Sequence, residues 1–103
     1  MVVWFRTSAL ERCYKEHKAA VKKWGREVAE RYVQRVNILY ACTSTKDLSS
    51  FPQLRFHPLK GDLKGRYALD LVGRWRLIVS FDGGRSQGGL LPNCRLTAGL
   101  WEE

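Results

Sequence analysis

The apolar residues of this chain change their spacing after a polar connection at Thr43 to Ser50. Before the connection they recur every three or four residues, which is the period of an amphipathic helix, and after it they alternate, as in a half-buried strand. Helices that precede a set of strands favour an α+β fold, with two N-terminal helices packed on a small antiparallel sheet. At 103 residues, 45% of them hydrophobic, the chain is expected to form a single domain over residues 1–103.

Two helices are expected before the connection, after a short first strand at Val2 to Arg6. Ser8 stands three residues before Glu11, the spacing of a capping box, and it predicts the start of the first helix. Gly25 predicts the end of this helix near Trp24. The second helix is marked by a broad apolar stripe at Val28, Ala29, Tyr32, Val33, Val36, Leu39 and Tyr40. Its other face carries Glu30, Arg31, Gln34 and Arg35.

Three sequential antiparallel strands are expected after the connection, separated by turns that contain glycine. They cover Leu54 to Leu59, Tyr67 to Val72 and Trp75 to Phe81. In the last strand Trp75 points to one face with Leu77, Val79 and Phe81, whereas Arg76 lies on the other face, where it can point at solvent. Residues 85–103 are rich in glycine and alternate only faintly from Arg95 to Trp101, so they could form either a further edge strand or a poorly ordered tail.

The charge of the chain limits its partners. The formal net charge is +8, which favours nucleic acid, an acidic protein or an anionic membrane surface. No apolar run approaches the roughly 20 residues of a membrane span, and the N-terminus lacks the layout of a signal peptide, so a cytoplasmic location is expected. Because Cys13, Cys42 and Cys94 form no Cys-x-x-Cys pair, neither a disulfide framework nor a zinc site is supported.

The segment from Pro52 to Arg76 holds six Lys and Arg residues against two Asp, a surplus that suits a polyanion. Its residue types also fit acid–base chemistry on RNA, because His57 can exchange protons near neutral pH, Lys60 is a second candidate, and arginines can hold a phosphate. Cleavage of RNA without a metal needs a base for the 2′-hydroxyl, an acid for the leaving 5′-oxygen and cations for the phosphorane. Taken without a family, such a basic set of strands is more often a binding surface than an active site, with His57 as a structural histidine.

The run LRFHPLKGD over residues 54–62, followed by Gly65, Tyr67 and Leu69 and by the strand WRLI over residues 75–78, resembles the signature of HigB-type toxins. These are the killer-protein branch of the RelE/ParE superfamily of bacterial toxin–antitoxin systems. The resemblance covers about residues 1–82 and implies a RelE-like β-α-α-β-β-β fold. It implies a ribosome-dependent mRNA endonuclease, an mRNA interferase that cuts message in the ribosomal A site by attack of the 2′-hydroxyl and so arrests growth.

By position, the resemblance places His57 and Lys60 on the catalytic histidine and lysine of the family, and Arg76 on its transition-state arginine. Candidates for phosphate contacts are Arg55, Lys64, Arg66 and Arg74. Trp75 could pack in the core, or it could stack on a base because it lies beside arginines. Neither a metal nor another cofactor is expected in this reaction.

The resemblance also implies partners: a cognate helix-turn-helix antitoxin, mRNA on the small ribosomal subunit, and operator DNA only through the antitoxin complex, without a membrane. Two features depart from the family pattern. Val72 stands where many members have an arginine, and no tyrosine follows Tyr67, so the usual tyrosine-containing last strand is replaced by residues 85–103. Two alternatives therefore stay open, a ParE-like toxin directed at a protein and a catalytically weak module that binds nucleic acid or antitoxin.

Overall fold

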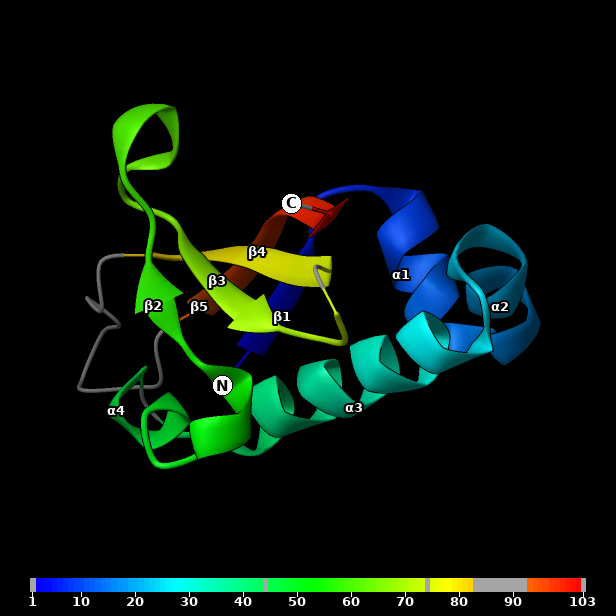
Figure 1. Ribbon diagram of the computed structural model, residues 1–103, viewed down its shortest axis with the longest axis horizontal. Coiled ribbons are helices and arrows are strands. Elements are labelled where there is room, and N and C mark those ends of the chain that lie inside the picture. The colour runs from blue at the N-terminus through cyan, green and yellow to red at the C-terminus, as the bar shows by residue number, and fades with distance from the viewer. Residues whose placement is uncertain (1, 44, 74, 83–92, 103) are drawn as a thin grey trace.

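In the computed structural model, which describes residues 2–43, 45–73, 75–82 and 93–102, a layer of helices packs against a five-stranded sheet (Figure 1). This is the α+β fold that the spacing of the apolar residues predicts. The elements follow in the order β1 (Val2–Phe5), α1 (Ser8–Lys15), α2 (His17–Trp24), α3 (Arg26–Ala41), α4 (Thr45–Leu48), η1 (Pro52–Leu54), β2 (His57–Pro58), η2 (Gly61–Leu63), β3 (Tyr67–Asp70), β4 (Trp75–Asp82) and β5 (Asn93–Glu102).

The first helical segment is divided into two short helices, where the sequence predicts one. The backbone of Glu16 is extended, which ends α1 and starts α2, and the bend lets both helices contact α3. Thr7, rather than Ser8, caps α1, since its hydroxyl accepts a hydrogen bond from the Leu10 amide at 3.2 Å. The predicted stop at Gly25 is confirmed, and its φ of 87° is a backbone conformation that favours glycine.

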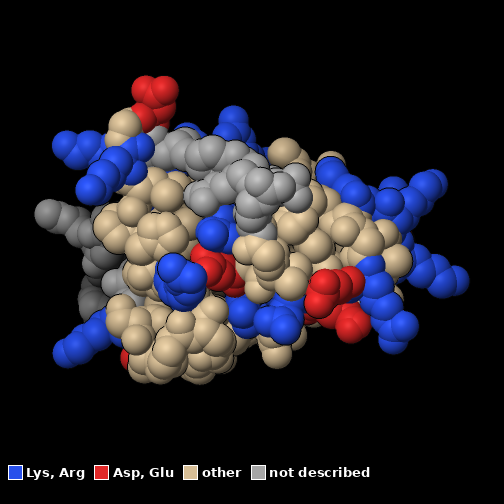
Figure 2. All heavy atoms as spheres, viewed as in Figure 1, with Lys and Arg blue, Asp and Glu red and all other residues tan. Residues whose placement is uncertain are grey.

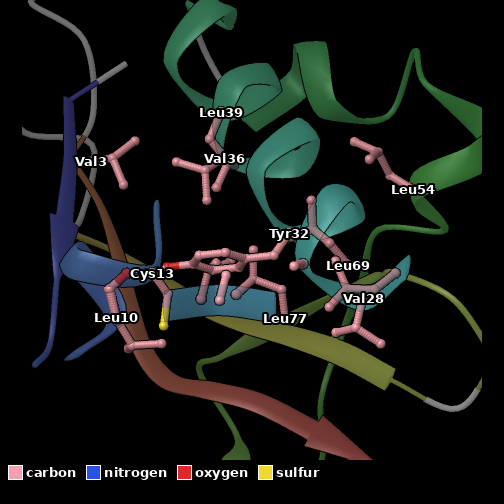
Figure 3. Close-up of a cluster of buried hydrophobic side chains, with 14 of the residues drawn as sticks. Val3, Leu10, Cys13, Val28, Tyr32, Val36, Leu39, Leu54, Leu69 and Leu77 are labelled. Atoms are coloured by element: carbon pink, nitrogen blue, oxygen red, sulfur yellow. Dashed lines mark hydrogen bonds between the residues drawn. The ribbon is translucent and has the colours of Figure 1, made fainter. Parts of the chain in front are cut away.

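Helix α3 supplies the centre of the core (Figure 3). Its Val28, Ala29, Tyr32, Val36 and Leu39 are buried, and they pack with side chains from the sheet and from α1, among them Val3, Leu10, Cys13, Leu69 and Leu77. The buried Tyr32 hydroxyl donates a hydrogen bond to the Leu10 carbonyl at 2.7 Å, so that this polar group is satisfied inside the core.

Two residues of α3 differ from the predicted stripe. Tyr40, at its end, is 43% exposed, whereas Arg35, which the sequence places on the polar face, is only 2% exposed. The broad stripe of apolar residues therefore runs along α3 as predicted, but one arginine lies inside it and Tyr40 is turned to the surface.

The sheet has the strand order β1-β5-β4-β3-β2. The sequential antiparallel pairing of β2, β3 and β4 is confirmed. The C-terminal strand β5 lies inside the sheet, parallel to β1 and antiparallel to β4, so the prediction of an edge position is wrong. The backbone groups of β5 can then pair with neighbours on both sides. Strand β2 is much shorter than predicted, because a 3₁₀ turn occupies Pro52–Leu54 and Arg55 adopts a left-handed conformation.

The two faces of β4 differ as the alternation predicts. Leu77 and Val79 belong to the core beneath the helices, and Trp75 and Phe81 pack against it. The opposite face, called here the outer face, carries Arg76 and Ile78. Ile78 is buried too, and it pairs in register with Ala68 of β3, which is likewise buried outside the helix-side core. Among the described residues, no helix has both the length and the apolar content needed to cross a membrane.

Candidate functional site

The outer face gathers two arginines around one carboxylate. Asp70 of β3 stands directly opposite Arg76 of β4, and its Oδ1 lies 2.9 Å from Arg76 Nε. Arg55, which precedes β2, reaches the other carboxylate oxygen, with 3.4 Å between its Nε and Asp70 Oδ2. Arg55, Asp70 and Arg76 are called the arginine–aspartate cluster below. Figure 2 shows acidic atoms among basic atoms near the C-terminal end of β3, where Asp70 ends that strand.

Arg76 is held in place by several partners. Besides the Asp70 contact, its Nη1 donates to the carbonyl oxygens of Gly73 and Trp75, both at 3.1 Å. The Arg76 side chain is only 15% exposed and that of Asp70 17%. The prediction that Arg76 points at solvent is therefore wrong, because the carboxylate across the strand pair and the carbonyls of the preceding turn hold the guanidinium against the sheet.

The orientation of the His57 ring follows from a single contact. His57 Nδ1 lies 2.6 Å from the backbone oxygen of Arg55. A carbonyl oxygen can only accept, so Nδ1 carries the proton, and the neutral ring presents an unprotonated Nε2. Arg55 has φ 46° and ψ 44°, and it is the one residue other than glycine with positive φ among those described. Its left-handed backbone thus places its carbonyl at the ring and starts β2.

His57 lies on the same outer face as the cluster. It pairs in register with Ala68 of β3, and Ala68 pairs with Ile78 of β4. Side chains of paired residues share a face, as do residues two apart on one strand, so Ala68 and Asp70 share the face of His57. Arg55 and Arg76 therefore meet at Asp70, and His57 lies on the same face of the sheet, opposite Ala68.

The two lysines occupy a different position. Lys60 and Lys64 flank the 3₁₀ turn η2 in the connection from β2 to β3, and both are exposed. Figure 1 shows this connection projecting from the sheet. Arg66 is half-buried at the base of the projection, where its carbonyl accepts from the Leu59 amide at 2.9 Å. Arg74, the remaining phosphate-binding candidate, lies outside the described residues.

Trp75 lies apart from the cluster. Its half-buried ring packs against the helix-side core, and alternation along β4 puts it on the face opposite Arg76. This position favours the core alternative over base stacking.

Sequence reasoning missed two residues of this site, Asp70 and Arg35. The Arg35 Nε donates to the backbone oxygen of Asp70 at 2.9 Å, and its Nη1 donates to Gln34 Oε1 at 3.1 Å. Burial lowers the pKa of Arg35, repulsion by Arg31 lowers it further, and attraction to Asp70 raises it. Sequence spacing could have indicated both residues. Arg35 stands three residues after the core residue Tyr32, which puts it near the buried side of the helix. The tight turn after Asp70 brings Asp70 opposite Arg76.

A second surface feature lies elsewhere. A hollow of about 360 Å³ next to β1 is lined by Val3, Trp4, Phe5, Glu11 and Tyr40. It lacks the grouped basic side chains of the outer face and holds none of the predicted site residues. Within the described part of the chain, no three His, Cys, Asp or Glu side chains gather as a metal site would require.

Comparisons with known proteins bear on the family and the fold. A family model described as "RelE-like toxin of type II toxin-antitoxin system HigB" matches residues 3–89. Among solved structures, a YoeB/ParE toxin from Agrobacterium tumefaciens is similar with a TM-score of 0.57 and 15% sequence identity, over 100% of this chain and 99% of that chain. At this identity the likeness shows the fold. A search of curated proteins gave no significant match.

Proposed function

The chain belongs to the HigB family of RelE-like toxins of type II toxin–antitoxin systems, and from this premise we propose that it inhibits translation as a ribosome-dependent mRNA endonuclease. The observation that carries the proposal is the outer face itself, where His57 contacts the Arg55 carbonyl and shares the face of the sheet on which Arg76 lies. A proton acceptor next to paired guanidinium groups is what the cleavage of a phosphodiester by its own 2′-hydroxyl requires.

In the proposed reaction, His57 Nε2 removes the proton of the 2′-hydroxyl. The 2′-oxygen attacks the adjacent phosphorus, and the bond from phosphorus to the 5′-oxygen breaks. Lys60 donates the proton that the departing 5′-oxygen takes up, which leaves a 2′,3′-cyclic phosphate and a 5′-hydroxyl. This assignment rests on the tautomer of His57, which the Arg55 carbonyl fixes, and on the exposed position of Lys60 three residues further along the chain.

Arg55 and Arg76 would stabilise the negative charge that builds up on the non-bridging oxygens. The lysine at position 64 and the arginine at position 66 would contact neighbouring phosphates, since both come from the connection that leads into β3. A metal ion has no assigned role in this scheme, because each of the three requirements has a candidate among the side chains. The basic surface would also make binding to RNA depend steeply on salt.

A second candidate function is supported by a specific observation. Asp70 already engages both Arg55 and Arg76, and no tyrosine follows Tyr67 in the sequence. Both features fit a catalytically weak module that binds RNA or antitoxin. The scaffold would then serve recognition, and mutation of His57 would leave its biological effect unchanged.

The family implies an antitoxin partner. We infer that a small helix-turn-helix protein encoded next to this chain fills this role, and that it either packs on the helices or lays an acidic segment over the basic outer face. Operator DNA would be bound through that complex. Action on translating ribosomes would place the chain in the cytoplasm.

The test is induced expression in a bacterium, followed by mapping of message 5′ ends on translating ribosomes. We expect new ends within codons at the A site, and loss of these ends by roughly a hundredfold in His57→Ala and in Lys60→Ala. His17→Ala, which changes an exposed histidine of α2, and Lys46→Ala, which changes an exposed lysine of α4, should leave the ends intact. Undiminished cleavage in either site variant would remove that residue from the mechanism, and growth arrest without new ends would favour a protein-directed toxin.

A further inference from the structure

Asp70 occupies the position at which two arginines of the outer face would bind an anion. We propose that the Asp70 carboxylate competes with RNA phosphate for Arg55 and Arg76, and so sets the affinity of the free protein for its substrate. The proposal rests on the proposed function in that it takes RNA as the ligand of this face. It gives a role to Asp70, which is neither a catalytic nor a phosphate-binding candidate.

The geometry of the cluster is that of a bound oxyanion. The two carboxylate oxygens are divided between two guanidinium groups, with 2.9 Å from Oδ1 to Arg76 Nε and 3.4 Å from Oδ2 to Arg55 Nε. Arginine binds carboxylate and phosphate oxygens with the same donor geometry. A phosphate that presents two non-bridging oxygens can therefore take over the contacts that Asp70 makes.

The exchange would begin at Arg55. The Arg55 side chain is 77% exposed, and an ion pair with such an exposed partner contributes little to stability. Arg55 can therefore turn from the carboxylate to an incoming phosphate at small cost. On the other side, Asp70 Oδ1 is buried and contacts Arg76 without an aligned hydrogen bond among the described residues. This contact is thus weaker than its short distance suggests.

The competition has a consequence for selectivity. With a formal net charge of +8, the protein attracts any nucleic acid through its phosphates. The Asp70 carboxylate lowers the binding free energy that a single phosphate can contribute, because each phosphate that enters must first displace Asp70 from an arginine. A substrate held by additional contacts, as on the ribosome, can still displace the carboxylate.

The test compares Asp70→Asn with Asp62→Asn. Both variants remove one negative charge, but Asp62 lies in the exposed turn η2, away from the cluster. The probe is a short single-stranded 2′-O-methyl RNA, which cannot be cut, and binding is followed by fluorescence anisotropy over a series of salt concentrations. We expect Asp70→Asn to bind the RNA about tenfold more tightly than the wild type. The plot of the logarithm of its association constant against the logarithm of the salt concentration should be steeper by about 1.4, because Arg55 and Arg76 each gain a phosphate contact. Asp62→Asn should change binding by about twofold or less.

The proposal would be overturned if the affinity of Asp70→Asn for the RNA rose no more than that of Asp62→Asn. The double variant Asp70→Asn/Arg55→Gln should lose most of the gain, and a gain kept in full would show that it does not pass through Arg55. If Asp70→Asn fails to fold, the wild-type protein gives the answer by NMR. Titration with the same RNA should shift the Nε–H signals of both Arg55 and Arg76, and signals that stay unchanged at saturation would contradict an exchange of partners.

These measurements separate the inference from the proposed function. Tighter binding in Asp70→Asn, combined with no cleavage of message in cells, would sustain the competition and reject the nuclease. Cleavage in cells without tighter binding in Asp70→Asn would reject the competition and sustain the nuclease.

Discussion

Arg35 of α3 and Asp70 of β3 connect the helical layer to the edge of the candidate site. The Arg35 Nε donates to the backbone oxygen of Asp70 at 2.9 Å, while the side chain of the same Asp70 contacts Arg55 and Arg76 on the outer face. One residue thus joins the core arginine to the two arginines of the surface. The position of the cluster depends on how α3 packs against the sheet.

Removal of this connection should lower stability. Arg35→Ala leaves the Asp70 carbonyl without its side-chain donor and removes a buried stem from the core, so we expect a loss of about 2 kcal/mol in the free energy of unfolding. Arg31→Ala, on the exposed face of the same helix, is the matched control and should have little effect. Urea denaturation measures both, and equal midpoints would show that the Arg35 contact carries no net stability.

Removal of the two arginines of the cluster should affect the stability of the protein differently, although both contact Asp70. Arg76→Ala leaves a carboxylate that is only 17% exposed without its main partner, and we expect a loss of about 2 kcal/mol. Arg55→Ala removes a side chain that is 77% exposed, so its melting temperature should match that of the wild type. Arg76→Lys should restore stability only in part, because the planar fork is lost. A larger effect at position 55 than at position 76 would contradict the burial described here.

Trp75 should behave as a packing residue. Trp75→Ala truncates a large ring that packs against the core, and we expect a loss of about 3 kcal/mol. Trp4→Ala, at a tryptophan that is 54% exposed, is the control and should change the melting temperature much less. If Trp75→Ala instead kept its stability and lost binding to 2′-O-methyl RNA, the ring would act as a base-stacking platform.

The Tyr32 hydroxyl should make stability depend on pH in alkaline solution. Burial raises its pKa, and charges on Cys13, Tyr40 and Tyr14 raise it further. A raised pKa in the folded state gives stability that is present below the unfolded pKa of about 10 and is lost as pH rises above it. Near neutral pH, the free energy of unfolding of the wild type should exceed that of Tyr32→Phe by about 1 kcal/mol, because only the wild type has the hydrogen bond to the Leu10 carbonyl.

Thermal melts from pH 7 to pH 11, taken for both proteins in the same buffers, test this difference. We expect the advantage of the wild type to be constant up to about pH 10 and to shrink above it. An advantage that stays constant above pH 10 would mean that the hydroxyl titrates without penalty in the folded protein, and one that grows would mean that folding lowers its pKa.

The sequence by itself determined the elements whose residues follow a strong period. The apolar stripe of α3, the strands β3 and β4 and the stop at Gly25 depend on local spacing, and all are present in the structure. Local spacing also put Arg76 and Trp75 on opposite faces of one strand. The family resemblance, carried by residues 54–62 and 75–78, is confirmed by the family model.

Tertiary structure decided where those elements meet. Only the pairing of β5 between β1 and β4 moved the C-terminal strand from an edge to the inside of the sheet, because strand order depends on contacts between distant segments. Only the register of β3 against β4 set Asp70 against Arg76, and only the packing of α3 carried Arg35 to the Asp70 carbonyl. A sequence shows that a residue carries charge, whereas the partner that neutralises this charge is selected when separate strands and helices come together in space.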